Sequence, residues 1–271
     1  MNCKIGFIGA GFMGMPIIRG IINAGVFKPE NICIFDLDIE KILSFAHVNG
    51  VVVSNSSKEL TETCDIIMIC VKPNVVKIVL DEIKPAFTAD KILVSIAAGI
   101  PLKTYKEALG QDKKVVRSMP NQPALIGAGM TLISYDNCLT KEDIIAVEEI
   151  FSAVGEVESI DEKLMNAVIS LTSSSPAYVF MLIEAMADAA VLEGIPRDQA
   201  YRLAANAVAG SAKMVAETGT HPGELKDAVC SPGGTTIAAL RVLEQKGFRS
   251  AVIEAMDVCT KRAFEMGKLY E

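Results

Sequence analysis

The sequence predicts an α/β fold: an N-terminal, doubly wound parallel sheet is followed by an all-helical C-terminal domain. An apolar run opens the chain and ends in glycines at positions 9, 11 and 14, a spacing typical of a strand-to-helix turn. Strand and helix signals then alternate to about residue 160, as in sheets whose parallel strands are joined by helices. Beyond residue 161 only helical patterns remain. We therefore expect two domains, residues 1–160 and 161–271.

The expected strands of the first domain are mostly short runs rich in Ile and Val, which is typical of strands covered on both faces. Their alternation with helical patterns predicts right-handed crossovers between parallel strands. The expected strands are residues 4–9, 31–35, 51–53, 66–71, 91–95 and 114–118, with helices at 12–24, 39–47, 58–63, 75–84 and 102–109. Residues 130–134 should add an edge strand, residues 141–152 a helix and residues 157–159 a last short strand.

The C-terminal part is rich in Ala, Leu, Met and Glu, which favour helices. Pro196 follows Gly194 and Ile195, a signal for one helix to stop and the next to begin. The expected helices are residues 162–170, 176–193, 196–217 and 248–265. The second of these is apolar most of the way round, so we expect burial against a second subunit, that is, a homo-oligomer. The alternative is a compact monomeric bundle.

Bulk composition excludes several classes of partner. The net charge of −7 and the isoelectric point near 5.1 argue against a nucleic-acid surface and against binding to an anionic membrane. Charges interrupt the apolar stretches, so no membrane-spanning helix is expected. The first strand begins without a basic leader segment, which favours a cytoplasmic protein.

Seven cysteines, an odd number without a CxxC pair, are typical of free thiols in a reducing cytosol. The histidines number two, His47 and His221, so we expect no metal site.

The glycine motif is the first candidate site. Gly9 permits a tight turn, Gly11 lets a pyrophosphate approach the backbone, and Gly14 allows close packing of helix on strand. The helix that follows would present its N–H groups to the phosphates. The motif therefore predicts a dinucleotide-binding, Rossmann-type domain whose cofactor loop is Gly9, Ala10, Gly11, Phe12, Met13 and Gly14. The alternative is a glycine-rich turn without a ligand.

Asp36 ends the second expected strand, where dinucleotide folds place an acid on the ribose hydroxyls. A carboxylate there favours a free 2′-hydroxyl over a 2′-phosphate, so NADH is preferred to NADPH. The alternative is that Asp36 or Asp38 caps the next helix, and both roles can coexist, one for each aspartate.

Later strands end in further candidates, because ligands bind outside the carboxyl ends of parallel strands. Lys72 would lie at the mouth of such a cleft, although it could equally be a solvated loop lysine. Small residues after position 95 leave room for a flat ring, and two prolines make a rigid loop around Asn121.

A polar segment in the helical domain is the candidate substrate loop. Residues 231–236 form a Pro-Gly-Gly turn that leads into a helix, whose first N–H groups can bind a carboxylate. The hydroxyls of Ser231, Thr235 and Thr236 can point into the same place. The alternative is an ordinary capped helix. A second polar helix entry precedes Pro176.

The chain resembles the pyrroline-5-carboxylate reductase family over nearly its whole length. The resemblance rests on residues 9–14, 71–73, 97–99, 119–121, Ser174 with residues 176–178, and residues 231–236. It implies reduction of the C=N bond of 1-pyrroline-5-carboxylate to L-proline, the last step of proline biosynthesis, with NADH or NADPH. It also implies a Rossmann domain and a helical substrate-binding domain that forms a homodimer, within a larger ring in some members.

The same resemblance implies roles for individual residues. Thr236 is expected to be catalytic, with its hydroxyl at the ring nitrogen, and the amides of residues 233–236 would bind the substrate carboxylate. The substrate residues are Ser231, Gly233, Gly234, Thr235, Thr236, Glu162 and Ser174. The cofactor residues, besides the glycine loop and Asp36, are Ser57, Val71, Lys72, Pro73, Ala97, Ala98, Gly99 and Asn121.

The chain departs from the family pattern at four places. Ser173 and Ser175 stand where glycines are usual, Gln122 where Thr is frequent, and Ser57 where Asn is common. These departures leave two alternatives: a paralogue that reduces a related cyclic imine acid, or a cofactor-binding regulatory protein without turnover.

Overall fold

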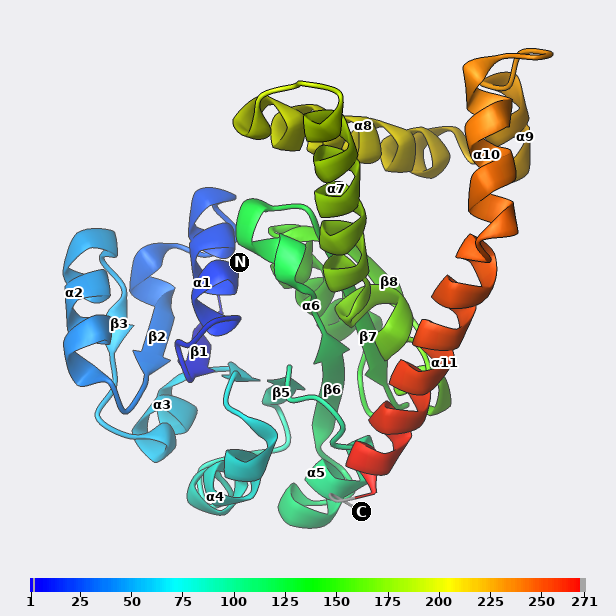
Figure 1. Cartoon of the computed structure of the whole chain (residues 1–271). Coiled ribbons are helices and arrows are strands. Elements are labelled where there is room, and N and C mark those ends of the chain that lie inside the picture. The colour runs from blue at the N-terminus through cyan, green and yellow to red at the C-terminus, as the bar shows by residue number, and fades with distance from the viewer. Residues whose placement is uncertain (2, 269–271) are drawn as a thin grey trace. The chain divides into compact units, whose positions relative to one another are not determined.

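The computed structural model describes residues 1 and 3–268. The chain forms two compact units. The first comprises Met1–Ser173 together with the chain from Thr260 onward, and the second is Ser174–Cys259. Figure 1 shows the course of the chain through the strands and helices of both units.

The first unit is built on one sheet, whose strands within the described residues follow the order β3-β2-β1-β4-β5-β6-β7-β8. All neighbouring pairs are parallel except β6 and β7. The strand order reverses beside β1, which is the place where open α/β sheets bind their ligands. The strands are β1 (Ile5–Ile8), β2 (Ile32–Phe35), β3 (Val52–Val53), β4 (Ile66–Ile69), β5 (Ile92–Ser95), β6 (Lys114–Met119), β7 (Gly129–Tyr135) and β8 (Gly155–Ser159).

The sequence predicted a strand at residues 130–134 on the edge of the sheet, and the predicted edge position is wrong. Strand β7 lies inside the sheet and runs antiparallel to β6, while β8 forms the edge. The link from β6 to β7 contains only the short 3-10 helix η2 (Gln122–Ile126), and a short link can turn a chain back but cannot cross over. The longer connection through α6 (Lys141–Ser152) returns β8 parallel to β7.

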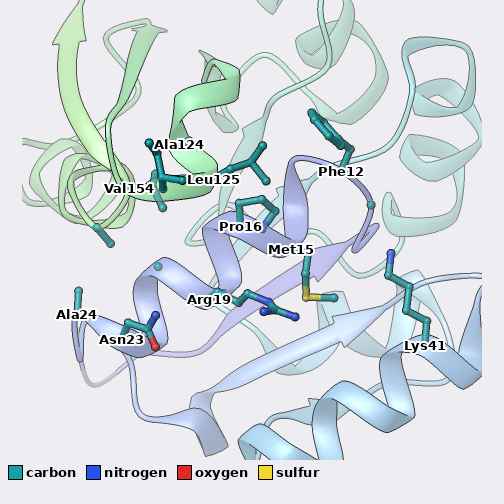
Figure 2. A pocket seen from close by; sticks show the side chains of 15 residues that line it. Phe12, Met15, Pro16, Arg19, Asn23, Ala24, Lys41, Ala124, Leu125 and Val154 are labelled. Atoms are coloured by element: carbon teal, nitrogen blue, oxygen red, sulfur yellow. The ribbon is translucent and has the colours of Figure 1, made fainter. Parts of the chain in front are cut away.

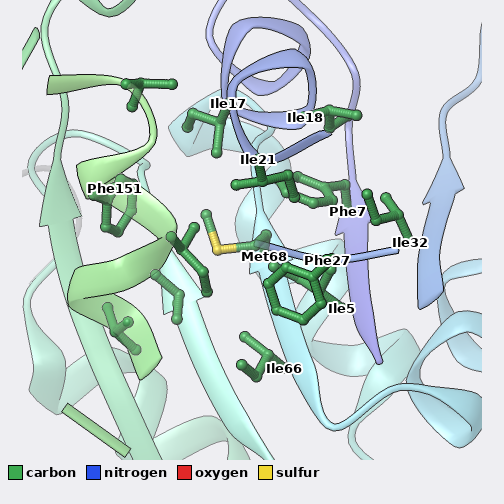
Figure 3. Packing of buried hydrophobic residues seen from close by; sticks show 14 of the residues in the cluster. Ile5, Phe7, Ile17, Ile18, Ile21, Phe27, Ile32, Ile66, Met68 and Phe151 are labelled. Carbon is green, nitrogen blue, oxygen red and sulfur yellow. The ribbon is translucent and has the colours of Figure 1, made fainter. Parts of the chain in front are cut away.

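Helices cover both faces of the sheet, as the doubly wound prediction requires. Alternate residues of each strand enter different cores: Ile5 and Phe7 belong to one cluster and Ile8 to the other. Figure 3 shows the first cluster, in which Ile17, Ile18 and Ile21 of α1 meet the strand residues. The first face carries α1 (Gly14–Asn23), α2 (Ile39–Asn49) and α6, and the second carries α3 (Ser57–Thr63), α4 (Pro73–Ile83) and α5 (Leu102–Leu109).

The expected helix at residues 162–170 is not regular. The chain forms the 3-10 turn η3 (Glu162–Leu164) and, after a short break, the π-helical turn η4 (Ile169–Ser173). The carbonyl of Ala167 accepts hydrogen bonds from the hydroxyls of Ser170 (3.2 Å) and Thr260 (3.4 Å). Such side-chain donors compete with the backbone N–H that a regular helix would supply.

The second unit is helical, as predicted. The loop after Gly194 separates α7 from α8, which pack against one another. A short helix that the sequence did not predict starts at Pro222, where the imidazole Nδ1 of His221 accepts from the N–H of Gly223 at 3.1 Å. The helices are α7 (Ser175–Leu192), α8 (Arg197–Thr218), α9 (Pro222–Ala228), α10 (Thr235–Gln245) and α11 (Phe248–Gly267), and α11 continues into the first unit.

Helix α7 leaves much apolar surface uncovered. Its buried residues are Pro176 and Ala187, whereas Phe180 is 54% exposed and Met181 is 74% exposed. By length and composition alone, residues 169–192 could cross a membrane. Glu184 and Asp188 interrupt this segment, as expected of the apolar stretches, but two charges still leave it within the length and composition of a membrane-spanning helix.

Candidate active site

The glycine turn after β1 has the geometry that the motif predicts. Gly9 has φ +97°, and a Cβ there would lie 2.8 Å from the carbonyl oxygen of Cys70. A Cβ on Gly14 would lie 2.6 Å from the carbonyl oxygen of Gly9, so helix and turn pack at backbone distance. No atom lies within 4 Å of the place where Gly11 would carry a Cβ. The turn is thus closed on its protein side and open at Gly11.

The open side of the turn is one end of a cavity of about 850 Å³ that runs along α1 (Figure 2). Its wall includes Gly11, Phe12, Met15, Arg19 and Lys41. Met13, at the N-cap of α1, contributes no side-chain hydrogen bond to the helix start. Free N–H groups of a helix start, together with a glycine that admits a phosphate, suit a dinucleotide. The residues present therefore fit the nicotinamide cofactor.

Asp36 orders this turn. Its Oδ2 accepts from the N–H of Ala10 at 2.6 Å, and its Oδ1 accepts from the N–H of Asp38 at 3.0 Å. Asp38 caps α2 by accepting from the N–H of Lys41 at 3.2 Å, so the helix-cap role predicted for one aspartate belongs to Asp38. The Nζ of Lys41 donates to the carbonyl of Ala10 at 2.7 Å.

Residues after β4 and β5 lie on the same edge of the sheet as the glycine turn, since these strands are parallel to β1. Val71 lies directly against Gly9, because its Cγ1 is 3.1 Å from the place of a Gly9 Cβ. Lys72 is exposed and precedes α4, which begins at Pro73. Beyond β5, Ala97 is buried, Ala98 is exposed and Gly99 has φ +81°.

Two predicted cofactor residues, Asn121 and Ser57, differ in how their polar groups are placed. The amide Nδ2 of Asn121 donates to the carbonyl of Thr172 (3.0 Å), and its Oδ1 accepts from the N–H of Met130 (2.9 Å). The side chain of Ser57 is buried at the start of α3, and its Oγ has no hydrogen-bond partner among the described residues. Asn121 therefore ties the loop after β6 to its surroundings.

Glu162 belongs to a network that the sequence did not indicate. Its Oε1 accepts from the N–H of Leu102 at 2.5 Å, so it caps α5 from a distant part of the chain. The same oxygen lies 3.5 Å from the Nη1 of Arg117, and Nη2 of this arginine donates to the Oδ1 of Asn166 at 2.7 Å. Burial lowers the pKa of the Arg117 guanidinium, and the charge of Glu162 opposes this effect.

Tyr105 and Ser95 extend the buried polar groups at this edge of the sheet. The two hydroxyls lie 2.6 Å apart, and Ser95 also accepts from the N–H of Ala97 at 3.2 Å. Burial raises the pKa of the Tyr105 phenol to about 12. The register of β5 and β6 pairs Ser95 with Arg117, so a buried cation lies next to the small-residue loop. The available sequence signal was a charged residue, Arg117, in the middle of an expected buried strand.

The candidate substrate loop lies in the second unit and begins α10. The N–H of Gly234 donates to the carbonyl of Ser231 at 3.0 Å, and Gly233 closes the turn with φ +68°. A Cβ on Gly234 would lie 2.3 Å from the Oγ of Ser231, so this hydroxyl would have to move if residue 234 carried a side chain. Gly234 is the N-cap and supplies no side chain, which leaves the N–H groups of Thr235 and Thr236 available to an anion.

Ser174 lies at the start of α7 in a different group of side chains. Its Oγ accepts from the Sγ of Cys259 at 3.3 Å. A hydrogen bond to Cys259 also raises the pKa of the nearby Tyr178 phenol. The structure thus brings the glycine loop together with residues 36 and 71–73 in one unit, and groups residues 231–236 in the other. No three His, Cys, Asp or Glu side chains gather as a metal site in the described part of the chain.

The chain matches two family models. One, described as pyrroline-5-carboxylate reductase dimerisation, matches residues 162–266, and the other, NADP oxidoreductase coenzyme F420-dependent, matches residues 4–99. The pyrroline-5-carboxylate reductase of Escherichia coli (strain K12) is 50% identical over 268 residues, which cover 99% of this chain and 100% of that protein.

Solved structures agree with these matches. A pyrroline-5-carboxylate reductase from Coxiella burnetii has a TM-score of 0.92 at 32% identity and covers 98% of this chain and 99% of its own. The pyrroline carboxylate reductase of Plasmodium falciparum, solved with NADP bound, has a TM-score of 0.87 at 33% identity and covers 98% of each chain. Both likenesses extend through the two units.

Proposed function

Because the chain belongs to the pyrroline-5-carboxylate reductase family, we propose that it reduces the C=N bond of 1-pyrroline-5-carboxylate to L-proline with NADH or NADPH. The observation that carries this proposal is identity of 50% over 99% of the chain. Both candidate loops lie within the matched length. Reduction of a cyclic imine is the last step of proline biosynthesis, and we propose that role for the chain.

The nicotinamide cofactor supplies the hydride, so the protein needs little acid–base equipment of its own. A protonated imine carbon is already electrophilic. The protein has to hold the two reacting carbons within about 3–3.5 Å and exclude water. Neither histidine is required for these tasks.

We assign the phosphate contacts to the glycine loop, whose open Gly11 and uncapped α1 support the assignment. Val71, Lys72, Pro73 and the small residues 97–99 would border the nicotinamide half, since they follow strands β4 and β5 on the same sheet edge. In this proposal Asn121 holds the loop after β6 in place, because both groups of its amide are already bonded. Ser57, whose buried hydroxyl has no partner among the described residues, keeps its assignment to the cofactor.

We assign the substrate carboxylate to the first N–H groups of α10 and the hydroxyl of Ser231. Thr236 is the proposed catalytic residue, and its hydroxyl donates to or relays a proton at the ring nitrogen. Glu162 orders the start of α5 from its place beside Arg117. Ser174 is proposed to border the substrate at the start of α7.

The wider organisation follows the same proposal. Residues 1–160 would bind the cofactor, and residues 161–271 would bind substrate and form the dimer. The uncovered apolar face of α7 supports a homodimer through the C-terminal helices, within a larger ring if further surfaces engage. A second copy, rather than a membrane, would then cover residues 169–192 in a cytoplasmic enzyme.

Thr236→Ala tests the site. We expect it to lower kcat about 10- to 100-fold, because one hydrogen bond to a charged group contributes about 1.5–3 kcal/mol. NADH binding should remain nearly intact. Steady-state oxidation of NADH with 1-pyrroline-5-carboxylate and with piperideine carboxylates measures turnover and substrate choice together.

The matched control is Thr218→Ala, which removes a hydroxyl bonded to the carbonyl of Met214 on α8. It should leave kcat unchanged. An unaltered kcat in Thr236→Ala would remove Thr236 from the site. Tight NADH binding by the unmodified protein without turnover of any cyclic imine would contradict the proposed reaction.

A further inference from the structure

We infer that Lys41 is the residue that lets this site accept the 2′-phosphate of NADPH. The inference rests on the cofactor role proposed for the glycine turn and goes beyond it by naming what selects between the two reductants.

Asp36 by itself would select against the phosphate. It is the acid at the end of β2, where a carboxylate meets the ribose hydroxyls and repels a 2′-phosphate. Its two oxygens, however, accept from the N–H groups of Ala10 at 2.6 Å and Asp38 at 3.0 Å. The carboxylate is therefore held against the turn by the protein backbone, and two N–H donors already offset part of its charge.

Lys41 places a cation at the same turn. The cap that Asp38 forms on α2 fixes the backbone of Lys41 in the first turn of that helix. From there its Nζ reaches the carbonyl of Ala10 at 2.7 Å, one peptide unit from the N–H that binds Asp36. The carbonyl of Ala10 is neutral, so it accepts from one of the three N–H donors of the Lys41 ammonium and does not compensate its charge. The remaining donors suit a phosphate.

The cavity shows that this cation faces a space large enough for a ligand. Lys41 and Gly11 both line the cavity of about 850 Å³, so the ammonium borders the same opening as the phosphate-admitting glycine. Figure 2 shows Lys41 on the side of the cavity that carries the turn, with Met15 between it and Arg19. The guanidinium of Arg19, the other cation of the cavity wall, lies over the ring of Phe45, 5.5 Å from its centroid.

The test measures nucleotide binding without any reaction. Isothermal titration with 2′,5′-ADP and with 5′-AMP compares two nucleotides that differ at the 2′-phosphate. We expect Lys41→Gln to weaken 2′,5′-ADP about tenfold, the loss typical of one charge-assisted hydrogen bond, and to leave 5′-AMP within about twofold. Lys41→Arg should restore most of the loss. Arg19→Gln, which removes the other cation of the cavity wall, should change neither affinity by more than about twofold.

Other outcomes would overturn the inference. Equal weakening of both nucleotides in Lys41→Gln would mean that Lys41 only orders the turn through Ala10. An equal effect of Arg19→Gln on 2′,5′-ADP would mean that general positive potential, and not Lys41, receives the phosphate. If the unmodified protein bound neither NADH nor NADPH, the cofactor role of the glycine turn would fail first, which distinguishes that failure from a failure at Lys41.

Discussion

At the scale of single residues, Asp36 shows that one carboxylate can have two compatible uses. Its position after β2 predicted that it binds the ribose hydroxyls. Its hydrogen bonds show that it also holds the glycine turn in place through Ala10. Each carboxylate oxygen has a second lone pair, so a backbone bond leaves room for a ligand bond. Position in the sequence predicted the role at the ribose, whereas the role in the turn depends on a hydrogen bond between residues 26 positions apart in the chain.

We expect Asp36→Ala to weaken NADH binding about tenfold, because the turn loses a charge-assisted hydrogen bond and the ribose loses its partner. The ratio of NADPH affinity to NADH affinity should rise, since a carboxylate that repels the 2′-phosphate is removed. Titration that follows nicotinamide fluorescence measures both affinities.

The control for Asp36 is Glu40→Ala, which removes an exposed acid from the first turn of α2. This variant should keep the affinity ratio within about twofold. An equal loss of affinity for both cofactors in Asp36→Ala would leave Asp36 as a structural brace without a part in cofactor choice.

At the scale of elements, helix starts connect distant parts of the chain. In α6 the Oγ1 of Thr140 accepts from the N–H of Asp143 at 3.2 Å, and the Oδ2 of Asp143 accepts from the N–H of Thr140 at 2.8 Å. This capping box also binds β6, because the Nζ of Lys114 lies 2.8 Å from Asp143 Oδ2. Burial raises the pKa of Asp143, but the bonds from Lys114 and Thr140 outweigh burial and lower it.

The pH dependence follows from that lowered pKa. The ionised form of Asp143 stabilises the fold above the pKa of the unfolded chain, about 3.9, and this contribution is lost as pH falls through the still lower folded pKa. We expect Asp143→Asn, which keeps an acceptor but no charge, to lower the free energy of unfolding by about 1 kcal/mol at pH 7. The difference from the unmodified protein should be smaller at pH 3 than at pH 7, because pH 3 lies below the unfolded pKa.

Urea denaturation at both pH values measures this difference. Glu142→Gln, in the same first turn but exposed, should change the free energy of unfolding by less than about 0.5 kcal/mol. A difference for Asp143→Asn that persists unchanged at pH 3 would exclude the ionised carboxylate as its cause.

At the scale of the whole molecule, the two units differ in how much of their apolar surface the single chain covers. The sheet unit buries its Ile and Val residues in two clusters. In the helical unit the buried hydrophobic residues are Ala187, Ala200 and Ala204, while large side chains of α7 such as Phe180 stay exposed. Apolar surface of this extent on a helical unit is typical of a protein–protein interface.

We expect Met181→Lys to shift the protein from the dimer toward the monomer. Each copy would lose about 2 kcal/mol of apolar burial at the interface, and the two lysine ammonium groups of a dimer would have to be removed from water. Light scattering coupled to size exclusion, over a dilution series, measures the mass. Val48→Lys, at a 79% exposed apolar position on α2, is the control and should leave the mass unchanged. An unaltered mass in Met181→Lys would place the interface elsewhere.

The parallel part of the sheet, the glycine turn and the helical character of the C-terminal unit could all be predicted from the sequence. Each of these follows from local order: a period of two or of 3.6 residues, Ile-rich runs, and glycines where a Cβ would meet backbone, as at Gly9 and Gly14. The residues of the two candidate loops were identifiable for the same reason, since each loop is contiguous in the chain.

The tertiary structure alone decided how distant residues share their polar groups. The antiparallel direction of β7, the use of both amide groups of Asn121, and the cap that Glu162 provides at Leu102 all depend on segments that meet only after folding. Lys41 at the carbonyl of Ala10 belongs with them. Hydrogen bonds and charges act over a few ångströms in space without regard to separation along the chain, so no local pattern records them.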